Sequence, residues 1–456
     1  MRIKLCIPMT LGEIAKAIGG LCKGKYSGRA VEYISTDTRD IYENDLFVPL
    51  LGEKYNGDAF ARDAFSIGSF IISKETPEAH IKVQNIDNVL LLLSEYYLRE
   101  KLHPKIKIGI TGSVGKTTTK EFLKTIFNQQ YKTHATKDNL NNQFGVPFTL
   151  LSAGAESDAI ITEFGMNSPG EISRLSKAVR PDIGIITKIG TAHIGRLGSR
   201  EGIAKAKLEI LDGMRESRLI APADEPLLKD YTWRSFSARD DLASCFIKRV
   251  GKSVSIKLPS GRFIFAPFSP IGESNLECLS AACAAAESAG VSPEAIKRGV
   301  SLISGNNIRQ KIYKLCGRYI IDDSYNASLE SFTAAFDMMS EYKDMPKRSA
   351  VLGCVLELGE HSESIHGMIG AAAASAGLGQ MFLVGDEAEY IADGAIAAGF
   401  PKSKIFIFKS ADEAGEIKNA IINHTAPDEL ILIKGSHALN LSKITNELKR
   451  STENSQ

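Results

Sequence analysis

The sequence predicts an α/β protein of three domains, and two observations lead to this prediction. The chain has 456 residues, which exceeds one ordinary core, because single domains usually hold about 100–200 residues. From Ile106 onward short apolar runs alternate with amphipathic helical segments, and a second alternation of this kind begins near Ile308. Such a βα order favours mostly parallel sheets with helices on both faces. We expect a small mixed α/β domain over 1–82, a central parallel-sheet domain over 83–307 and a Rossmann-like domain over 308–456.

Composition narrows the functional classes. Hydrophobic residues make up 43% and charged residues 24% of the chain, as in soluble globular proteins. The formal net charge is only +1, so the chain has no large excess of positive charge to attract nucleic acid, and no nucleic-acid partner is expected. Seven cysteines without a CxxC pair disfavour a disulfide framework and indicate a reducing compartment. No apolar run resembles a signal peptide or approaches the ~20 residues that span a bilayer. We expect a cytoplasmic, monomeric protein without stable membrane insertion.

Individual elements follow from local patterns. In the first region, turn-forming runs such as Asn56-Gly57-Asp58 separate short strands, and a helix is expected over Asn88–Glu100 before Pro104 interrupts the chain. In the central region Ser199 is a plausible N-cap for a helix through Met214. Residues 252–268 resemble a hairpin, and the Ala-rich helix Leu276–Ala289 ends at Gly290. The strands expected in the two later regions are Ile106–Thr111, Ala159–Glu163, Ile183–Lys188, Tyr319–Ile321, Ala350–Gly353, Met381–Gly385, Ile405–Phe408 and Leu430–Ile433.

A glycine-rich loop gives the clearest functional signal. The run Gly109-Ile-Thr-Gly-Ser-Val-Gly-Lys-Thr117 follows a predicted strand and opens a helix expected over Lys116–Gln130. Backbone N–H groups and the helix dipole then face a common anion site. Lys116 would reach the outer phosphates of a nucleotide, and the Thr117 hydroxyl would ligate Mg²⁺. The spacing departs from the Walker pattern, because Ile110 stands where that pattern has glycine. The alternative is a glycine-rich turn without a ligand, but the loop favours a P-loop ATPase-like central domain.

Three further residues follow the loop in order. Glu163 ends an apolar strand, where a carboxylate would suit Mg²⁺, although an exposed strand-end carboxylate is the simpler interpretation. His193 follows the next strand and, taken alone, is an ordinary loop histidine. Lys207 lies in Ala204-Lys-Ala-Lys-Leu-Glu209, which otherwise reads as a solvated helix face. None of the three is decisive by itself.

Their order along the chain resembles the central domain of the Mur ligase family. Motifs elsewhere extend the resemblance over nearly the whole chain, and they are most similar to those of family members that add a terminal dipeptide. These motifs are Ser35-Thr-Asp-Thr-Arg39, Asp45-Leu-Phe-Val48, Asp138-Asn-Leu-Asn-Asn-Gln-Phe-Gly-Val-Pro147, Ile321-Asp-Asp-Ser-Tyr-Asn-Ala327, Leu356-Glu-Leu-Gly359 and Ile433-Lys-Gly-Ser436. In this family, too, the first glycine of the loop stands one position before its place in the Walker pattern, as Gly109 does here.

The resemblance implies an ATP-dependent ligase that forms a C–N bond through an acyl phosphate. The implied substrates are UDP-N-acetylmuramoyl-tripeptide and D-alanyl-D-alanine (D-Ala-D-Ala), in peptidoglycan precursor synthesis. Two Mg²⁺ ions are implied, one held by Thr117 and Glu163 and one by His193 with Lys207. A lysine cation cannot ligate Mg²⁺, and family members carbamylate this lysine with CO₂. Two metals would clamp the attacking carboxylate and the transferring phosphoryl group, while Lys116 neutralises charge in the transition state.

The resemblance also assigns binding residues. Arg309 matches an arginine that touches the outer phosphate from the C-terminal domain, which would make domain closure a precondition for chemistry. The implied nucleotide contacts are Gly112, Ser113, Gly115, Lys116, Thr117, Thr118, Asn275, Asp323 and Tyr325. The implied UDP-muramoyl or dipeptide contacts are Ser35, Asp37, Thr38, Arg39, Asn139, Asn141, Asn142 and Asn326. His366 is a weaker candidate, with a helix-surface histidine as the alternative.

Several departures from the family pattern leave alternatives open. Ser274 and Cys278 replace a His and an Asn, and His437 stands where Arg is usual. A thiol is a poor substitute for the paired donor and acceptor of an amide. The other interpretations are a sister ligase that adds another amino acid or D-Ala-D-lactate, a homologue without activity, and a non-ligating P-loop nucleotide-binding protein. The third residue of the tripeptide, meso-diaminopimelate or lysine, stays open.

Overall fold

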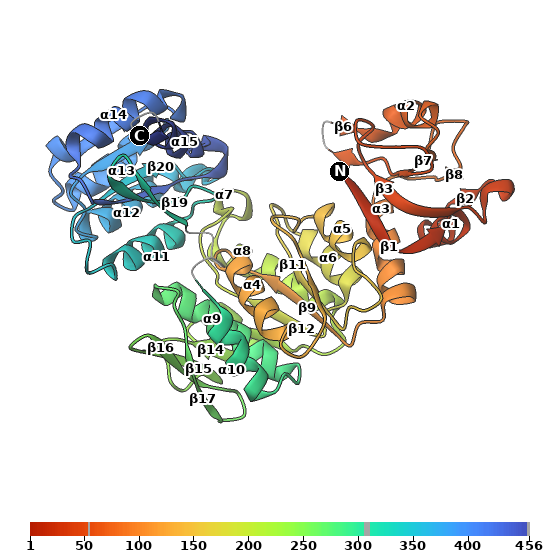
Figure 1. Cartoon of the computed structure of the whole chain (residues 1–456), viewed down its shortest axis with the longest axis horizontal. Helices are drawn as coiled ribbons and strands as arrows, with labels where there is room; N and C mark the ends of the chain where they lie inside the picture. The colour runs from red at the N-terminus through yellow and green to blue at the C-terminus, as the bar shows by residue number, and fades with distance from the viewer. Residues whose placement is uncertain (53–54, 305–310, 454–456) are drawn as a thin grey trace.

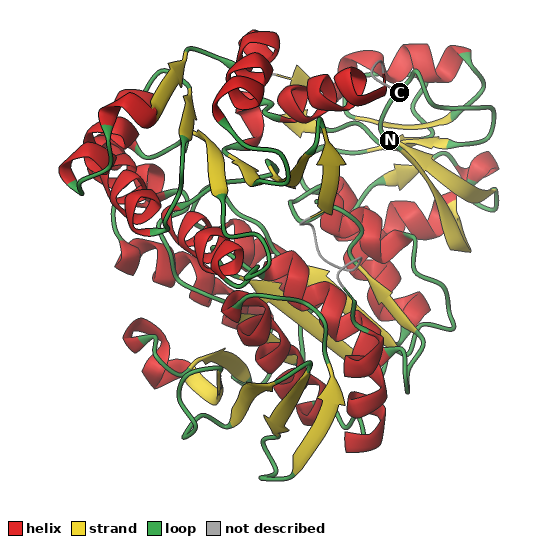
Figure 2. Ribbon diagram, turned by 60° about the vertical axis from the view of Figure 1, so that its left-hand side comes forward, coloured by secondary structure: helices red, strands yellow, loops and turns green. Residues whose placement is uncertain are grey.

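The chain folds around three main β-sheets that follow one another along the sequence (Figure 1). The structure is a computed structural model, and it describes residues 1–52, 55–304 and 311–453. In Figure 1 the N-terminal sheet lies at the upper right, the C-terminal sheet at the upper left, and the central domain between and below them. Figure 2 shows helices flanking the strands of each part. The predicted α/β class is confirmed.

The N-terminal sheet is mixed and has six strands in the order β1-β3-β4-β7-β8-β2. Helix α1 (Leu11–Ile18) begins in a capping box, where the Thr10 hydroxyl accepts from the Glu13 N–H, and its apolar side is buried against the sheet. The elements of this region are β1 (Arg2–Thr10), α1, β2 (Leu21–Cys22), β3 (Ala30–Ser35), β4 (Leu46–Phe47), β5 (Leu51–Gly52), β6 (Tyr55–Asn56), α2 (Ala61–Ser66), β7 (Phe70–Ser73) and β8 (Ile81–Lys82).

The central sheet has nine strands in the order β10-β11-β9-β12-β13-β14-β15-β16-β17. The strands from β10 to β15 are parallel, and β16 and β17 continue the sheet as the predicted antiparallel hairpin. Strand bounds are β9 (Ile106–Thr111), β10 (Thr133–Ala135), β11 (Ala159–Glu163), β12 (Ile183–Ile186), β13 (Leu219–Pro222), β14 (Thr232–Ser237), β15 (Cys245–Val250), β16 (Ser253–Lys257) and β17 (Phe263–Pro267). The expected strands β9 and β11 have the predicted bounds.

Helices cover both faces of the central sheet, which explains why its middle strands are mostly apolar and largely buried. Ser199 caps α8 as predicted, because its hydroxyl accepts from the Gly202 N–H. The helix expected over Lys116–Gln130 ends three residues earlier, at Phe127. Helix bounds are α3 (Val89–Tyr97), α4 (Lys116–Phe127), α5 (Gly145–Leu151), α6 (Glu171–Val179), α7 (Ile194–Leu197), α8 (Arg200–Leu208), α9 (Glu273–Ser288) and α10 (Pro293–Leu302).

The C-terminal sheet has six strands in the order β18-β19-β23-β20-β21-β22. All neighbours are parallel except β18, an antiparallel edge strand that the sequence patterns did not predict. Element bounds are β18 (Lys311–Leu315), β19 (Arg318–Asp323), α11 (Leu329–Ser340), β20 (Arg348–Gly353), α12 (Ser362–Ser375), β21 (Met381–Val384), α13 (Ala388–Ala397), β22 (Ile405–Phe408), α14 (Ala414–His424), β23 (Leu430–Lys434) and α15 (Ser442–Glu453).

The predicted domain limits stay proposals. The limit at 82/83 falls after β8, the last strand of the first sheet, and α3 then packs against both α1 and α5. The limit at 307/308 lies outside the described residues. Within the described ranges, none of the helices has the length and apolar character needed to cross a bilayer.

Candidate functional site

A cavity of about 420 Å³ opens at the carboxyl ends of β9 and β11 and extends to the C-terminal domain. This is where a parallel sheet presents ligands. It unites most of the residues that the sequence singled out. Those that line it are Gly112, Ser113, Gly115, Lys116, Thr117, Thr118, Asn139, Asn141, Asn142, Glu163, His193, Lys207, Asn275, Asp323, Tyr325 and Asn326.

The glycine-rich loop has the backbone shape of an anion-binding turn. Gly112 and Gly115 have φ angles of 150° and 86°, in the region that favours glycine. A Cβ on Gly112 would lie 1.9 Å from the Thr187 hydroxyl oxygen, so no side chain fits there. That hydroxyl, on the residue after β12, donates to the Val114 carbonyl at 2.6 Å and so holds the loop. Lys116 Nζ donates to the Gly112 carbonyl at 2.6 Å. The loop is therefore shaped to receive phosphates at the start of α4.

Glu163 is positioned by two neighbouring side chains. It ends β11 with only 2% of its surface exposed, so the solvated strand-end alternative is wrong. The Thr117 hydroxyl donates to Glu163 Oε2 at 2.9 Å, and Asn141 Nδ2 donates to Oε1 at 2.8 Å. A hydroxyl and a carboxylate oxygen thus lie side by side next to the phosphate loop. This pair suits Mg²⁺, which prefers hard oxygen ligands.

His193, the N-cap residue of α7, and Lys207 of α8 line the same cavity. His193 Nδ1 lies 2.7 Å from Glu357 Oε2; burial lowers the pKa of the imidazole, and Glu357 opposes this. Lys207 is 2% exposed, so the solvated helix face is wrong for this residue. Burial, with a smaller contribution from Lys116, holds the pKa of Lys207 well below its usual range. Burial therefore favours the neutral form of the amine, which has a free lone pair.

A self-sufficient metal centre is not present: the described residues contain no group of three His, Cys, Asp or Glu side chains that could hold an ion. Mg²⁺ sites commonly combine one or two carboxylates with substrate phosphates and water. Glu163, Thr117 and His193 fit such a site because each lines the cavity beside the loop.

The C-terminal domain adds a second wall. Lys434 is buried at the end of β23, and its Nζ donates to Asp323 Oδ2 at 2.6 Å and to the Asn326 carbonyl at 3.0 Å. It therefore fixes the loop that places Asp323, Tyr325 and Asn326 at the cavity. The Tyr325 ring meets His437 edge-on, with centroids 5.5 Å apart.

A second cavity of about 440 Å³ lies on the other side of the phosphate loop and shares Val114, Gly115, Ser274 and Ala334 with the first. Cys278 lines it and is buried, with its thiol 3.7 Å from the Gly115 carbonyl. Burial raises the pKa of that thiol to about 11. Glu277 also lines this cavity, and burial raises the pKa of its carboxyl to about 7.

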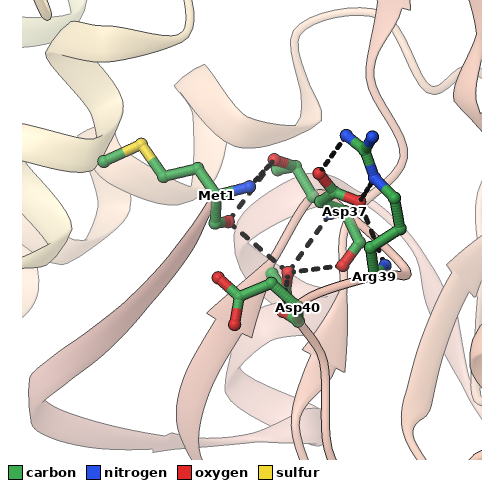
Figure 3. Close-up of polar contacts among 6 residues, drawn as sticks. Met1, Asp37, Arg39 and Asp40 are labelled. Atoms are coloured by element: carbon green, nitrogen blue, oxygen red, sulfur yellow. Dashed lines mark hydrogen bonds and ion pairs between the residues drawn. The ribbon is translucent and has the colours of Figure 1, made fainter.

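Four predicted substrate residues lie elsewhere. Ser35, Asp37, Thr38 and Arg39 belong to the N-terminal sheet region and do not line either cavity. Arg39 faces Asp37 across a bidentate contact (Figure 3), and its side chain is 88% exposed. This guanidinium holds the pKa of Asp37 below its usual range. Ser35 is buried, and its hydroxyl donates to the Asp40 carbonyl at 2.7 Å, so it supports the turn.

The remaining predicted residues are Arg309 and His366. Arg309 lies outside the described residues. His366 is fully buried rather than on a helix surface, and its Nε2 accepts from the Val355 N–H at 2.9 Å, so it supports the fold. Sequence reasoning missed the partner of His193, Glu357, although its motif Leu356–Gly359 was recognised. Nothing in the sequence relates two residues 164 positions apart.

Comparisons with known proteins agree with this geometry. Residues 110–286 match the Mur ligase middle domain, and residues 309–437 match the family described as Mur ligase, glutamate ligase domain. UDP-N-acetylmuramoyl-tripeptide--D-alanyl-D-alanine ligase of Bacillus subtilis is 34% identical over 97% of this chain and 98% of its own length. The enzyme of the same name from Escherichia coli is 31% identical over 84% of this chain and 88% of its own length.

Solved structures are similar to this chain over nearly its whole length. A crystal structure of MurF from Acinetobacter baumannii has a TM-score of 0.87 at 28% identity and covers 98% of this chain and 100% of its own. MurF ligase from Thermotoga maritima in complex with ADP has a TM-score of 0.80 at 23% identity, covering 93% of this chain and 98% of its own, and shows the shared fold. The phosphate loop, the ordered Glu163, His193 and Lys207, and these matches lead to one conclusion: the chain belongs to the Mur ligase family.

Proposed function

We propose that this protein joins D-Ala-D-Ala to the terminal carboxylate of UDP-N-acetylmuramoyl-tripeptide, using ATP and an acyl-phosphate intermediate. The observation that carries the proposal is the convergence of Thr117, Asn141 and Glu163 at one place. A hydroxyl from the phosphate loop and an amide from the Asn139–Asn142 motif share one buried carboxylate. The nucleotide side and the muramoyl side of the site thus meet at Glu163.

The residues of the chain have distinct roles in this reaction. Gly112, Ser113 and Gly115 line the phosphate side of the cavity, and Lys116 supplies a positive charge to the transferring phosphoryl group. The substrate carboxylate attacks that group and releases ADP, which leaves an acyl phosphate. The amine of the dipeptide then attacks the acyl carbon, releasing phosphate and a proton as the amide bond forms. Positioning and electrostatic stabilisation therefore supply most of the rate increase.

We assign two Mg²⁺ positions, one at Thr117 and Glu163 and one at His193 with Lys207. When bound, the ions would polarise the phosphoryl group and hold the attacking carboxylate near it. The neutral amine favoured by the burial of Lys207 is the form that adds CO₂, and a carbamate there would provide an anionic oxygen ligand. The low exposure of Lys207 supports this assignment, because such a group would be shielded from bulk water.

The remaining assignments follow the same family relationship. Asn275, Thr118, Asp323 and Tyr325 would contact the nucleotide, and Asn139, Asn142 and Asn326 the muramoyl-peptide or the dipeptide. The exposed Asp37–Arg39 pair, with Thr38 and Ser35, would contact the uridine nucleotide in the N-terminal domain. Arg309 is proposed to reach the outer phosphate. We further propose that the protein is a cytoplasmic monomer.

The test is a reconstituted ligation. Purified protein is mixed with UDP-N-acetylmuramoyl-tripeptide, D-Ala-D-Ala, ATP and Mg²⁺, and phosphate release and the pentapeptide product are followed together. We expect both only when all four components are present. Phosphate release without an amine would overturn the ligase assignment in favour of a nucleotide hydrolase. A panel of other amines and D-Ala-D-lactate would identify a sister ligase, and tripeptides with meso-diaminopimelate or lysine would define the acceptor.

A further inference from the structure

His193 meets the C-terminal domain through one carboxylate. Its Nδ1 lies 2.7 Å from Glu357 Oε2, and an Arg196 N–H donates to the other carboxylate oxygen at 2.9 Å. An ionised carboxylate only accepts hydrogen bonds, so Nδ1 carries the proton of this contact. Nδ1 is the only ring nitrogen of His193 that bonds to a described residue. The neutral ring therefore keeps its lone pair on Nε2, the nitrogen left for a ligand in the cavity.

The backbone around Glu357 is fitted closely to the central domain. We call residues 357–361 the docking loop. The Gly195 N–H donates to the Glu357 carbonyl at 3.1 Å. A Cβ on Gly195 would lie 2.6 Å from that carbonyl oxygen and 2.7 Å from the Gly359 nitrogen, so only glycine allows this approach. At the other end of the loop, His361 Nε2 lies 3.3 Å from the Gly198 carbonyl.

Glu357 itself has an uncommon backbone conformation for a residue other than glycine, with φ at 64°. Such conformations cost free energy and persist where the surrounding structure holds them. Among the described residues, the hydrogen bonds of Glu357 come from α7 and its N-cap, which belong to the central domain. The orientation of the carboxylate therefore depends on domain contact.

We propose that Glu357 is a positioning residue of the ligase site: from the C-terminal domain it holds His193 with Nε2 available to a divalent cation. The inference rests on the proposed function, because it concerns the same site. Partners of this kind fix the tautomer and the ring orientation of metal-binding histidines. Docking of the loop thus raises cation affinity, and by thermodynamic reciprocity a bound cation strengthens docking.

Variants of two nearby glutamates distinguish this positioning role from a role in which Glu357 only helps to hold the two domains together. Glu357→Ala removes the acceptor, and Glu357→Gln keeps an amide oxygen at the same place. Glu360→Ala is the matched control, since this side chain of the docking loop is 88% exposed and lies 3.9 Å from His361. Thermal unfolding of each variant verifies that the fold is kept.

The first readout needs no turnover. Protein labelled with ¹⁵N in its eight histidines is studied by NMR, with His193→Gln used to assign the His193 signals. We expect the Nδ1–H tautomer in the wild type, in Glu357→Gln and in Glu360→Ala, and its loss in Glu357→Ala. The second readout is Mn²⁺ binding by EPR with a non-hydrolysable ATP analogue. We expect about 10–100-fold weaker binding in Glu357→Ala, with partial recovery in Glu357→Gln.

The outcomes are distinguishable. If Glu357→Ala keeps the wild-type tautomer and Mn²⁺ affinity, the positioning role is wrong, whatever its effect on activity. If Glu360→Ala weakens Mn²⁺ as much as Glu357→Ala does, general loosening of the loop explains the effect and the inference is also wrong. Failure of the proposed function would appear separately, as an absence of ligation in wild-type protein whose NMR and EPR behaviour is as expected.

Discussion

Replacing Glu163 by glutamine tests the central assignment, because the change removes one charge and keeps the shape. Both carboxylate oxygens accept hydrogen bonds, from Thr117 at 2.9 Å and from Asn141 at 2.8 Å. Hydrogen bonds to charged groups contribute about 1.5–3 kcal/mol and neutral ones about 0.5–1.5 kcal/mol. Loss of charge therefore weakens the two contacts by about 2–3 kcal/mol together. The amide must also be reoriented so that its NH₂ faces the Thr117 oxygen.

An opposing contribution comes from burial. Glu163 is 2% exposed, and keeping an ionised group out of water costs several kcal/mol. The two contributions nearly cancel, so the free energy of unfolding of the ligand-free protein should change by less than about 1 kcal/mol. For a domain of this size, that corresponds to a shift in Tm of about 2–4 °C or less. Catalysis has no such compensation, since the negative charge is needed for the cation.

We expect Glu163→Gln to lower kcat/KM by about 100–1,000-fold, the range for loss of one preorganised electrostatic group. The assay is coupled phosphate release, with Tm measured with and without ATP and Mg²⁺; the variant should lose the ligand-induced rise in Tm. The matched control is Glu209→Gln, whose carboxylate accepts from the Gly170 and Ser173 N–H groups outside the cavity. That control should lose stability and keep turnover. Turnover of Glu163→Gln within about threefold of wild type would refute the reasoning.

Three further predictions concern single side chains. Lys116→Ala should abolish phosphate release with little change in Tm, because its Nζ contact to the Gly112 carbonyl lies within a partly exposed loop; unchanged turnover would count against the phosphate role. Lys207→Ala should be inactive, and formate or acetate should restore part of the activity in a rate titration if a carbamate normally supplies an anionic oxygen. Glu277 has a folded pKa of about 7 against an ordinary value of 4.5, so its stability contribution is complete below about pH 4.5 and falls as pH rises through 7. At pH 8, Glu277→Gln should consequently have a higher Tm than wild type, by an amount equivalent to at most about 2–3 kcal/mol. At pH 4.5 the two proteins should have the same Tm. Identical pH profiles of Tm for variant and wild type would contradict this prediction.

Local sequence was sufficient for the elements around the site. Strands β9 and β11 have the predicted bounds because each is a mostly apolar run that is largely buried in the middle of the sheet. The phosphate loop was identifiable because its function depends on backbone conformations that favour glycine at fixed spacing. Strand β18 was missed, since an edge strand with one exposed face lacks a distinctive apolar run.

Burial could not be inferred from the same patterns. Lys207 and His366 both occur in sequences that allow a solvated helix face, and both are buried in the structure. A helix segment does not by itself say which neighbours pack against it. The pKa of Lys207 depends on those neighbours, because desolvation is its largest cause.

The sequence by itself determined the α/β class, the phosphate loop and the order of Glu163, His193 and Lys207, because these depend on short-range periodicity and on residue types at close spacing. Only the tertiary structure decided that Asn141 and Thr117 share Glu163 and that Glu357 meets His193 from another domain. Such contacts join residues 22 to 164 positions apart. They arise from the packing of whole sheets and helices, and no local pattern encodes the distance between two side chains on different elements.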